Sequence, residues 1–88
     1  MTPAEAAEWM FGELQRVGWL DQEAVAGELL KRDKSLVYMN NNGNPAIDPK
    51  VLKAFNKLAP TSDYVWSRSE RHWRKRAKYD VPDKRMQD

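Results

Sequence analysis

The sequence has 88 residues, which is enough for one small domain and excludes a second, because independently folding domains rarely have fewer than about 50 residues. Hydrophobic residues make up 41% of the chain and charged residues 32%. This balance excludes a disordered charged tail, and no apolar run approaches the roughly 18 residues of a membrane span. The absence of cysteine excludes disulfide scaffolds, zinc knuckles and thiol nucleophiles.

The net charge of +2 conceals two halves of opposite sign. Residues 1–44 carry four cationic against seven acidic side chains, a net charge of −3, whereas residues 45–88 carry eleven against six, a net charge of +5. Such segregation favours a polyanionic partner for the basic half. The first residues show neither the cationic nor the apolar region of a signal peptide, so we expect a cytoplasmic protein of bacterial type.

The first predicted helix begins with a capping box formed by Thr2 and Glu5, with Pro3 in the first helical position. It ends near Val17, because Gly18 can adopt the left-handed conformation that terminates helices. Apolar residues recur at spacings of three and four and predict one face toward the core. These residues are Ala7, Met10, Phe11, Leu14 and Val17.

The second predicted helix follows a two-residue extended link, residues 19–20. Asp21 is expected to cap this helix, which runs from Gln22 to about Arg32. Its predicted buried face consists of Val25, Ala26, Leu29 and Leu30.

The segment that follows is predicted to contain a turn. Residues 36–39 are apolar and fit either a strand or an extension of the helix, and the pair Asn42-Gly43 is the strongest turn signal in the chain. We interpret the asparagines around it as turn residues, because Asn tolerates positive φ and hydrogen-bonds its own backbone. The alternative is that these side chains contact adenine edges. The asparagines are Asn40, Asn41, Asn42 and Asn44.

The third predicted helix starts at Asp48-Pro49 and runs to about Ala59, before Pro60. At 100° per residue its apolar and cationic residues fall on opposite faces. The apolar face consists of Val51, Leu52, Phe55, Leu58 and Ala59, and the cationic face of Lys50, Lys53 and Lys57. Three lysines opposite an apolar stripe are also what any soluble amphipathic helix shows.

The C-terminal segment from Tyr64 is predicted to form a β-hairpin. With Ser69-Glu70 as the loop, Arg68 faces Arg71 and Trp66 lies directly opposite Trp73. The alternative is a helix after Ser67, whose spacing to Glu70 also fits a capping box. We favour the hairpin because it accounts for both tryptophans.

The large aromatic residues are expected to supply most of the core. Trp19, Trp66 and Trp73 are predicted to be buried. Trp9 lies off the main stripe of its helix, and we expect it to pack against the C-terminal segment, the alternative being an exposed anchor for a partner. The folded domain is predicted to cover residues 1–80, and residues 81–88 to form a loose tail.

The order helix, short strand, helix, helix, two-stranded hairpin resembles the winged helix-turn-helix domain over roughly residues 3–76, including the junction Trp19-Leu20-Asp21. The chain is also similar to small bacterial proteins described only as a domain of unknown function with winged-helix-like character. The residues that carry this second resemblance are Tyr38, Asn42-Gly43-Asn44, Val51 to Phe55, Trp66 and Trp73-Arg74-Lys75-Arg76. The resemblance implies a mainly α-helical α+β fold, with three helices and a C-terminal two-stranded wing, but no activity.

The winged-helix resemblance implies that the third helix is a recognition helix and that the hairpin touches the nucleic-acid backbone or minor groove. Lysines provide charge with little sequence-reading geometry, so we expect weak sequence preference. The link from Arg32 to Asp48 is longer than the three or four residues of a tight helix-turn-helix, and an inserted turn there would lie where DNA approaches. The predicted binding residues are Lys50, Lys53, Lys57, Arg68, Arg71, Arg74, Lys75 and Arg76.

Enzymatic functions are not indicated by the sequence. The single imidazole, His72, lies among cations, which disfavours a metal site, and the chain contains no nucleophile–His–carboxylate set and no glycine-rich phosphate loop. We therefore expect no catalysis, no metal and no small-molecule cofactor. The expected partner is duplex DNA or another polyanion, and the alternative is a protein–protein interaction module or a homodimer; a membrane is not expected.

Overall fold

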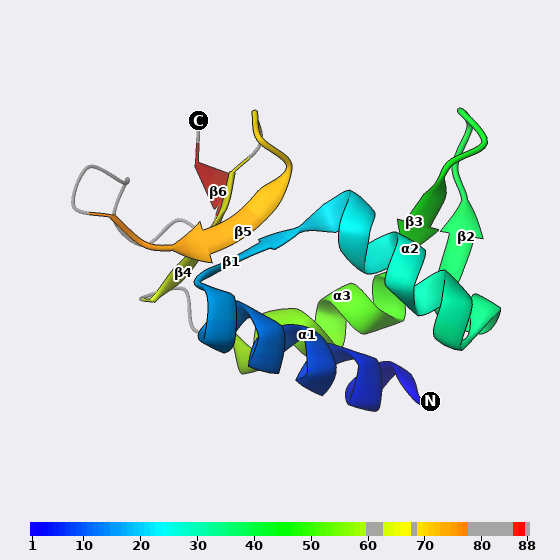
Figure 1. The fold of residues 1–88 in the computed structure, drawn as a ribbon, viewed down its shortest axis with the longest axis horizontal. Coiled ribbons are helices and arrows are strands. Elements are labelled where there is room, and N and C mark those ends of the chain that lie inside the picture. The colour runs from blue at the N-terminus through cyan, green and yellow to red at the C-terminus, as the bar shows by residue number, and fades with distance from the viewer. Residues whose placement is uncertain (60–62, 68, 78–85, 88) are drawn as a thin grey trace.

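The computed structural model describes residues 1–59, 63–67, 69–77 and 86–87 (Figure 1). In this part of the chain three α-helices and two β-sheets form an α+β domain, which confirms the predicted class. The elements in chain order are α1 (Pro3–Val17), β1 (Trp19–Asp21), α2 (Gln22–Arg32), the 3₁₀-helix η1 (Lys34–Leu36), β2 (Val37–Met39), β3 (Pro45–Ile47), α3 (Pro49–Leu58), β4 (Tyr64–Ser67), β5 (His72–Lys75) and β6 (Met86–Gln87).

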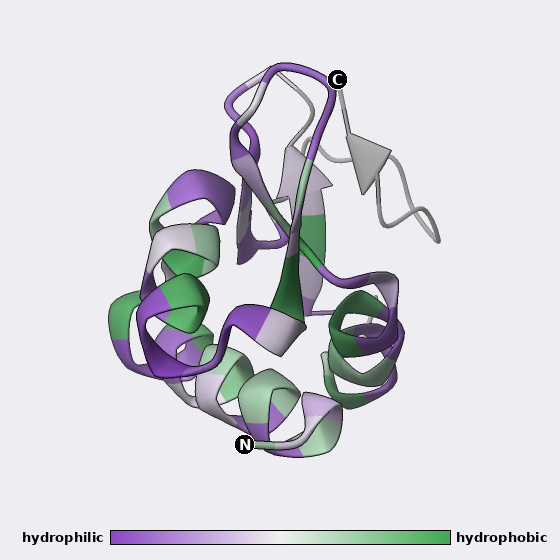
Figure 2. Cartoon of the chain, turned by 90° about the vertical axis from the view of Figure 1, so that its right-hand side faces the viewer, coloured by the Kyte–Doolittle hydropathy of each residue, from purple (hydrophilic) through white to green (hydrophobic). Residues whose placement is uncertain are grey.

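The larger sheet has the strand order β1-β5-β4-β6, and β2 and β3 form a second sheet of two strands. The β4-β5 and β2-β3 hairpins rise on either side of the start of α2 and project in the same direction, away from α1 and α3 (Figure 1). In the view turned by 90° the hairpin tips are again at the top, where the chain is hydrophilic (Figure 2). The fold therefore has a helical end and a hairpin end.

The three helices begin and end where the sequence predicts. The hydroxyl of Thr2 accepts a hydrogen bond from the Glu5 N–H at 3.1 Å, and the Glu5 carboxylate accepts one from the Thr2 N–H at 2.8 Å. Gly18 ends α1 with φ 94°, and the carboxylate of Asp21 accepts a bond from the Ala24 N–H at 2.9 Å at the start of α2. These caps satisfy backbone groups that the first and last helical turns leave unpaired.

The asparagine segment forms the turn of the β2-β3 hairpin. Oδ1 of Asn40 accepts hydrogen bonds from the backbone N–H groups of Asn42 at 2.9 Å and Asn44 at 3.0 Å. The Asn40 N–H donates to the Asn44 carbonyl at 2.9 Å, and Gly43 has φ 78°. The interpretation as turn chemistry is confirmed for Asn40, whose side chain binds the backbone of the turn. Of the apolar residues before the turn, Leu36 ends η1 and residues 37–39 form β2.

The C-terminal hairpin has the predicted register, with Trp66 opposite Trp73, so the helical alternative is wrong. The connection between its strands is longer than the expected two-residue loop Ser69-Glu70, because the last residue pair of the two strands is Ser67 with His72. Arg71 lies in the loop with φ 56° and donates its N–H to the Ser67 carbonyl at 2.8 Å. The predicted pairing of Arg68 with Arg71 concerns a residue, Arg68, that lies outside the described part of the chain.

The core includes Trp73, which is 4% exposed and packs on Phe55 of α3 and Trp66 of β4 with ring centroids 5.0 and 4.8 Å apart. Such aromatic pairs contribute about 0.5–1.5 kcal/mol beyond their burial. Residues from every helix and from β1 and β3 complete the cluster: Ala6, Ala7, Met10, Leu14, Leu20, Val25, Ala26, Leu29, Leu36, Ile47, Val51 and Ala59.

Two of the four tryptophans lie where the sequence does not predict them. Trp19 is 51% exposed, because successive side chains of a strand point to opposite faces and Leu20 occupies the core face. Trp9 packs at the edge of the core with the Arg32 guanidinium of α2 4.7 Å from its ring centroid, where the sequence predicts a C-terminal partner. Trp66 is half-buried.

Two residues predicted on helix core faces are exposed as well, since each lies in the last turn of its helix. Val17 at the end of α1 is 47% exposed, and Leu58 at the end of α3 is also exposed. Of the predicted tail at 81–88, the structure describes only β6, which pairs in parallel with β4. The other tail residues lie outside the described part of the chain.

Candidate nucleic-acid interface

The predicted cationic face of α3 is present and exposed. Lys50, Lys53 and Lys57 are all exposed, whereas Val51 and Phe55 on the opposite face are fully buried. Because Phe55 packs against Trp73 of β5, the lysines point away from the sheet.

The lysine face lies beside α1, which packs along α3. It forms one wall of a shallow hollow whose other wall includes Glu8 of α1. None of the ion pairs found among the described residues involves Lys50, Lys53 or Lys57. Their charge is therefore left for solvent or a ligand. The lining residues are Ala4, Glu8, Lys50, Lys53, Ala54, Lys57 and Leu58.

Two of the predicted cations lie along β5. Nη1 of Arg74 donates to the Lys75 carbonyl at 3.2 Å, and Arg74 stands opposite Trp19 of β1. The Lys75 side chain runs beside the end of α1, its Cε 4.0 Å from where a Cβ on Gly18 would lie. After the strand, the Arg76 N–H donates to the Asp63 carbonyl at 2.8 Å.

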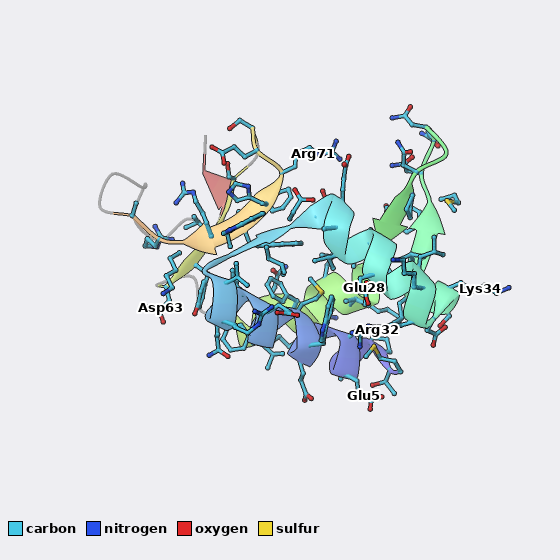
Figure 3. The ribbon with its side chains drawn as sticks, viewed as in Figure 1. Glu5, Glu28, Arg32, Lys34, Asp63 and Arg71 are labelled. Atoms are coloured by element: carbon cyan, nitrogen blue, oxygen red, sulfur yellow. The ribbon has the colours of Figure 1, made fainter. Side chains whose placement is uncertain are left out.

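Arg71 occupies a different place from the other predicted cations. Its carbonyl accepts a hydrogen bond from the Gln22 N–H at 3.2 Å, which joins the β4-β5 turn to the start of α2. Its side chain is labelled at the top of Figure 3, between the hairpins. There it lines a polar recess of about 280 Å³ together with Gln22, Glu23, Asn40, Asn42, Asn44, Pro45 and Ala46.

The structure therefore does not gather the predicted residues onto one continuous face. The lysines of α3 share a face beside α1, Arg74 and Lys75 lie on β5, and Arg71 faces the asparagine hairpin. Of the eight predicted residues, Arg68 falls outside the described part of the chain.

His72 contacts two neighbouring side chains, those of Glu70 and Trp19. Its Nε2 lies 3.1 Å from the Glu70 carboxylate, and its ring packs beside Trp19 with centroids 5.7 Å apart. The described residues contain no group of three or more His, Asp or Glu side chains that could hold a metal ion. No helix in the described part of the chain is long and apolar enough to cross a membrane.

A groove that the sequence did not predict lies between α1 and α2. Its walls include the indoles of Trp9 and Trp19 and the exposed Val17, and the Glu28–Arg32 ion pair at 3.3 Å lies on its rim. The alternation of Trp19 and Leu20 across a strand was the signal that would have placed Trp19 outside. The other lining residues are Glu13, Arg16, Leu20, Asp21, Ala24 and Val25.

Comparison with known proteins identifies one family. Residues 2–75 match a family of unknown function, DUF6953, and the chain belongs to this family. No curated protein and no solved structure matches the chain.

Proposed function

We propose that this DUF6953 protein is a small, non-enzymatic, winged-helix-like domain that binds nucleic acid with weak sequence preference. The exposed lysine face of α3, formed by Lys50, Lys53 and Lys57, is the observation on which the proposal rests. Three exposed cations on one helix face suit a row of phosphates, since neutralising phosphates and releasing their counterions supplies most of the affinity in binding with little sequence preference.

The order of the elements supports a winged-helix-like arrangement. Three helices are followed by the β4-β5 hairpin, and β1, between the first two helices, joins that hairpin as a third strand through the pair Leu20 with Trp73. In helix-turn-helix proteins a recognition helix enters the major groove while neighbouring elements contact the backbone. Here α3 takes the first role and the cations of β5 the second.

The charge distribution also supports this assignment. Two acidic side chains of the first two helices form local ion pairs: Glu13 pairs with Arg16, and Glu28 pairs with Arg32. Glu5 is held by the cap of α1. The lysines of α3 have no such partner among the described ion pairs, so this helix offers its charge to a polyanion.

Charge reversal on α3 tests the proposal. Anisotropy with a labelled duplex in low salt should show that Lys53→Glu/Lys57→Glu weakens binding by at least tenfold, because two attractive phosphate contacts become repulsive. The matched control is Lys31→Glu/Lys34→Glu, which makes the same charge change at exposed residues of α2 and η1 and should cost less than threefold. Absence of any micromolar complex, or equal losses in both variants, would reject the proposal.

Self-association is a second candidate function, favoured by the groove between α1 and α2. Trp19 is 51% and Val17 47% exposed at its edge, and exposed aromatic side chains are typical of interface anchors. The occupant we propose is a second copy of this chain, because the acidic half that forms the groove complements the basic half.

Light scattering over a concentration series tests this second candidate. We expect a dimer that Trp19→Ser converts to a monomer, with unchanged circular dichroism. A monomer at all concentrations up to millimolar would reject self-association without bearing on nucleic-acid binding.

A further inference from the structure

We propose that the recess between the two hairpin tips holds one nucleotide of an unpaired strand, with its phosphate on Arg71 and its base edge against Asn42, Asn44 and Glu23. This inference rests on the proposed nucleic-acid binding and adds a second contact region to it, separate from the lysine face of α3.

The recess is a built feature of the fold. The turn of the β2-β3 hairpin forms one wall, Gln22 and Glu23 at the start of α2 form the floor, and Arg71 from the β4-β5 loop forms the other wall. Figure 1 shows the two hairpins rising on either side of the start of α2. Its volume of about 280 Å³ is slightly below the roughly 300 Å³ at which the usual range of ligand pockets begins.

The wall of the recess formed by Asn40, Asn42 and Asn44 is fixed by hydrogen bonds to its backbone. Two of its three side-chain amides remain available to a ligand. Oδ1 of Asn40 accepts the two backbone bonds that fix the turn. No hydrogen bond found in the described part of the chain uses the side chains of Asn42 or Asn44. Each amide therefore keeps a donor and an acceptor, the pair of groups that Asn uses to read a base edge.

The position of Arg71 is also fixed. Its N–H donates to Ser67 and its carbonyl accepts from Gln22, so the backbone is tied to both β4 and α2. The acid next to it, Glu70, is engaged by His72 at 3.1 Å. No ion pair among the described residues includes Arg71, and its guanidinium can hold a phosphate by two parallel hydrogen bonds.

The charges of the recess favour a nucleotide over a free phosphate. Glu23 lines the recess with Arg71 but forms no ion pair with it. A carboxylate repels an inorganic anion, yet it accepts hydrogen bonds from an exocyclic amino group of a base. A cation, a carboxylate and two amides together match a ligand that has a phosphate at one end and a base with donors and acceptors at the other.

The base must be unpaired to enter the recess. A base inside a duplex exposes only its groove edges, and extruding it costs the free energy of stacking and pairing. In a single strand the cost is smaller, because the base is not paired. Asn binds adenine through two parallel bonds to N6 and N7. The favoured ligand is therefore a single strand that contains adenine.

The test uses Arg71→Gly, because glycine adopts φ 56° without strain and the variant removes only the side chain. Anisotropy would be measured with an oligo(dA) octanucleotide, an oligo(dT) octanucleotide and a duplex. We expect the wild type to prefer oligo(dA) over oligo(dT), and Arg71→Gly to weaken oligo(dA) binding about tenfold, with little change for the duplex. Asn42→Ala/Asn44→Ala should abolish the preference for oligo(dA), whereas Lys53→Ala should weaken binding of all three ligands alike.

The outcomes separate this inference from the proposed function. If Arg71→Gly binds oligo(dA) like the wild type while the α3 charge reversal still weakens duplex binding, the recess assignment is wrong and the proposed function stands. If the wild type binds neither single strands nor duplex in low salt, both are wrong. Equal melting temperatures of Arg71→Gly and the wild type show that a loss of binding is not a loss of folding.

Discussion

The indole of Trp73 lies edge-on against the ring of Phe55, with centroids 5.0 Å apart. This contact joins the C-terminal hairpin to the core face of α3, which also packs along α1. The lysines occupy the opposite, exposed side of the same helix.

Truncating this contact should therefore destabilise the whole domain. We expect Trp73→Ala to lower the free energy of unfolding by about 3–5 kcal/mol, because it removes a large buried side chain and leaves a cavity. The control is Trp19→Ala, which truncates the same residue type at a position that is 51% exposed and should cost less than about 1 kcal/mol. Urea unfolding measures both; equal losses would contradict the described core.

Asp21 connects β1 to α2 and caps the helix through the Ala24 N–H at 2.9 Å. We expect Asp21→Ala to cost about 1 kcal/mol, because this N–H loses its acceptor. Asp21→Asn should restore most of the loss, since asparagine caps helices as well as aspartate does. The urea midpoints of the two variants would show this. A similar loss in both would mean that the charge, and not the cap, stabilises the domain.

Two carboxylates are expected to make the stability of the domain depend on pH. A hydrogen bond from the Thr2 backbone N–H lowers the pKa of Glu5, and hydrogen bonds from the Ser35 hydroxyl and N–H lower the pKa of Asp33. A carboxyl group whose pKa is lower in the folded than in the unfolded chain stabilises the fold when the pH is above its unfolded pKa. This stabilisation is lost as the pH falls through the folded pKa.

We therefore expect the urea midpoint to fall as the pH drops below about 4, the ordinary range of carboxyl pKa values. Glu5→Gln should reduce this fall, because glutamine stays neutral at every pH. A wild-type and a Glu5→Gln protein with identical pH profiles would show that the capping carboxylate of Glu5 does not contribute.

The features that the sequence predicts correctly depend on neighbours in the chain. The ends of α1 follow from Thr2, Glu5 and Gly18, whose roles are set within a single helical turn. The asparagine turn is equally local, as is the register that places Trp66 opposite Trp73 across a short loop. In each case the physical cause lies within about ten residues.

The features that the sequence does not predict depend on contacts between segments that are far apart in the chain. Trp19 is outside because β1 pairs with β5, more than fifty residues away, in a register that turns Leu20 inward. Arg71 faces the asparagine hairpin because its carbonyl binds the N–H of Gln22. The alternation of Trp19 and Leu20 indicates that one of them faces outward, but no pattern within either segment indicates the partner strand or the bond from Gln22 to Arg71. The division of the predicted basic surface into separate regions therefore became visible only in the folded chain.

The salt dependence of duplex binding tests the central claim most directly. Each phosphate contact contributes about 0.9 to the slope of log affinity against log salt concentration. If Lys50, Lys53 and Lys57 each neutralise one phosphate, replacing all three by alanine should reduce the slope by about 2.7 relative to the wild type. An unchanged slope, or wild-type affinity in the triple variant, would contradict the assignment of α3 as the nucleic-acid-binding helix.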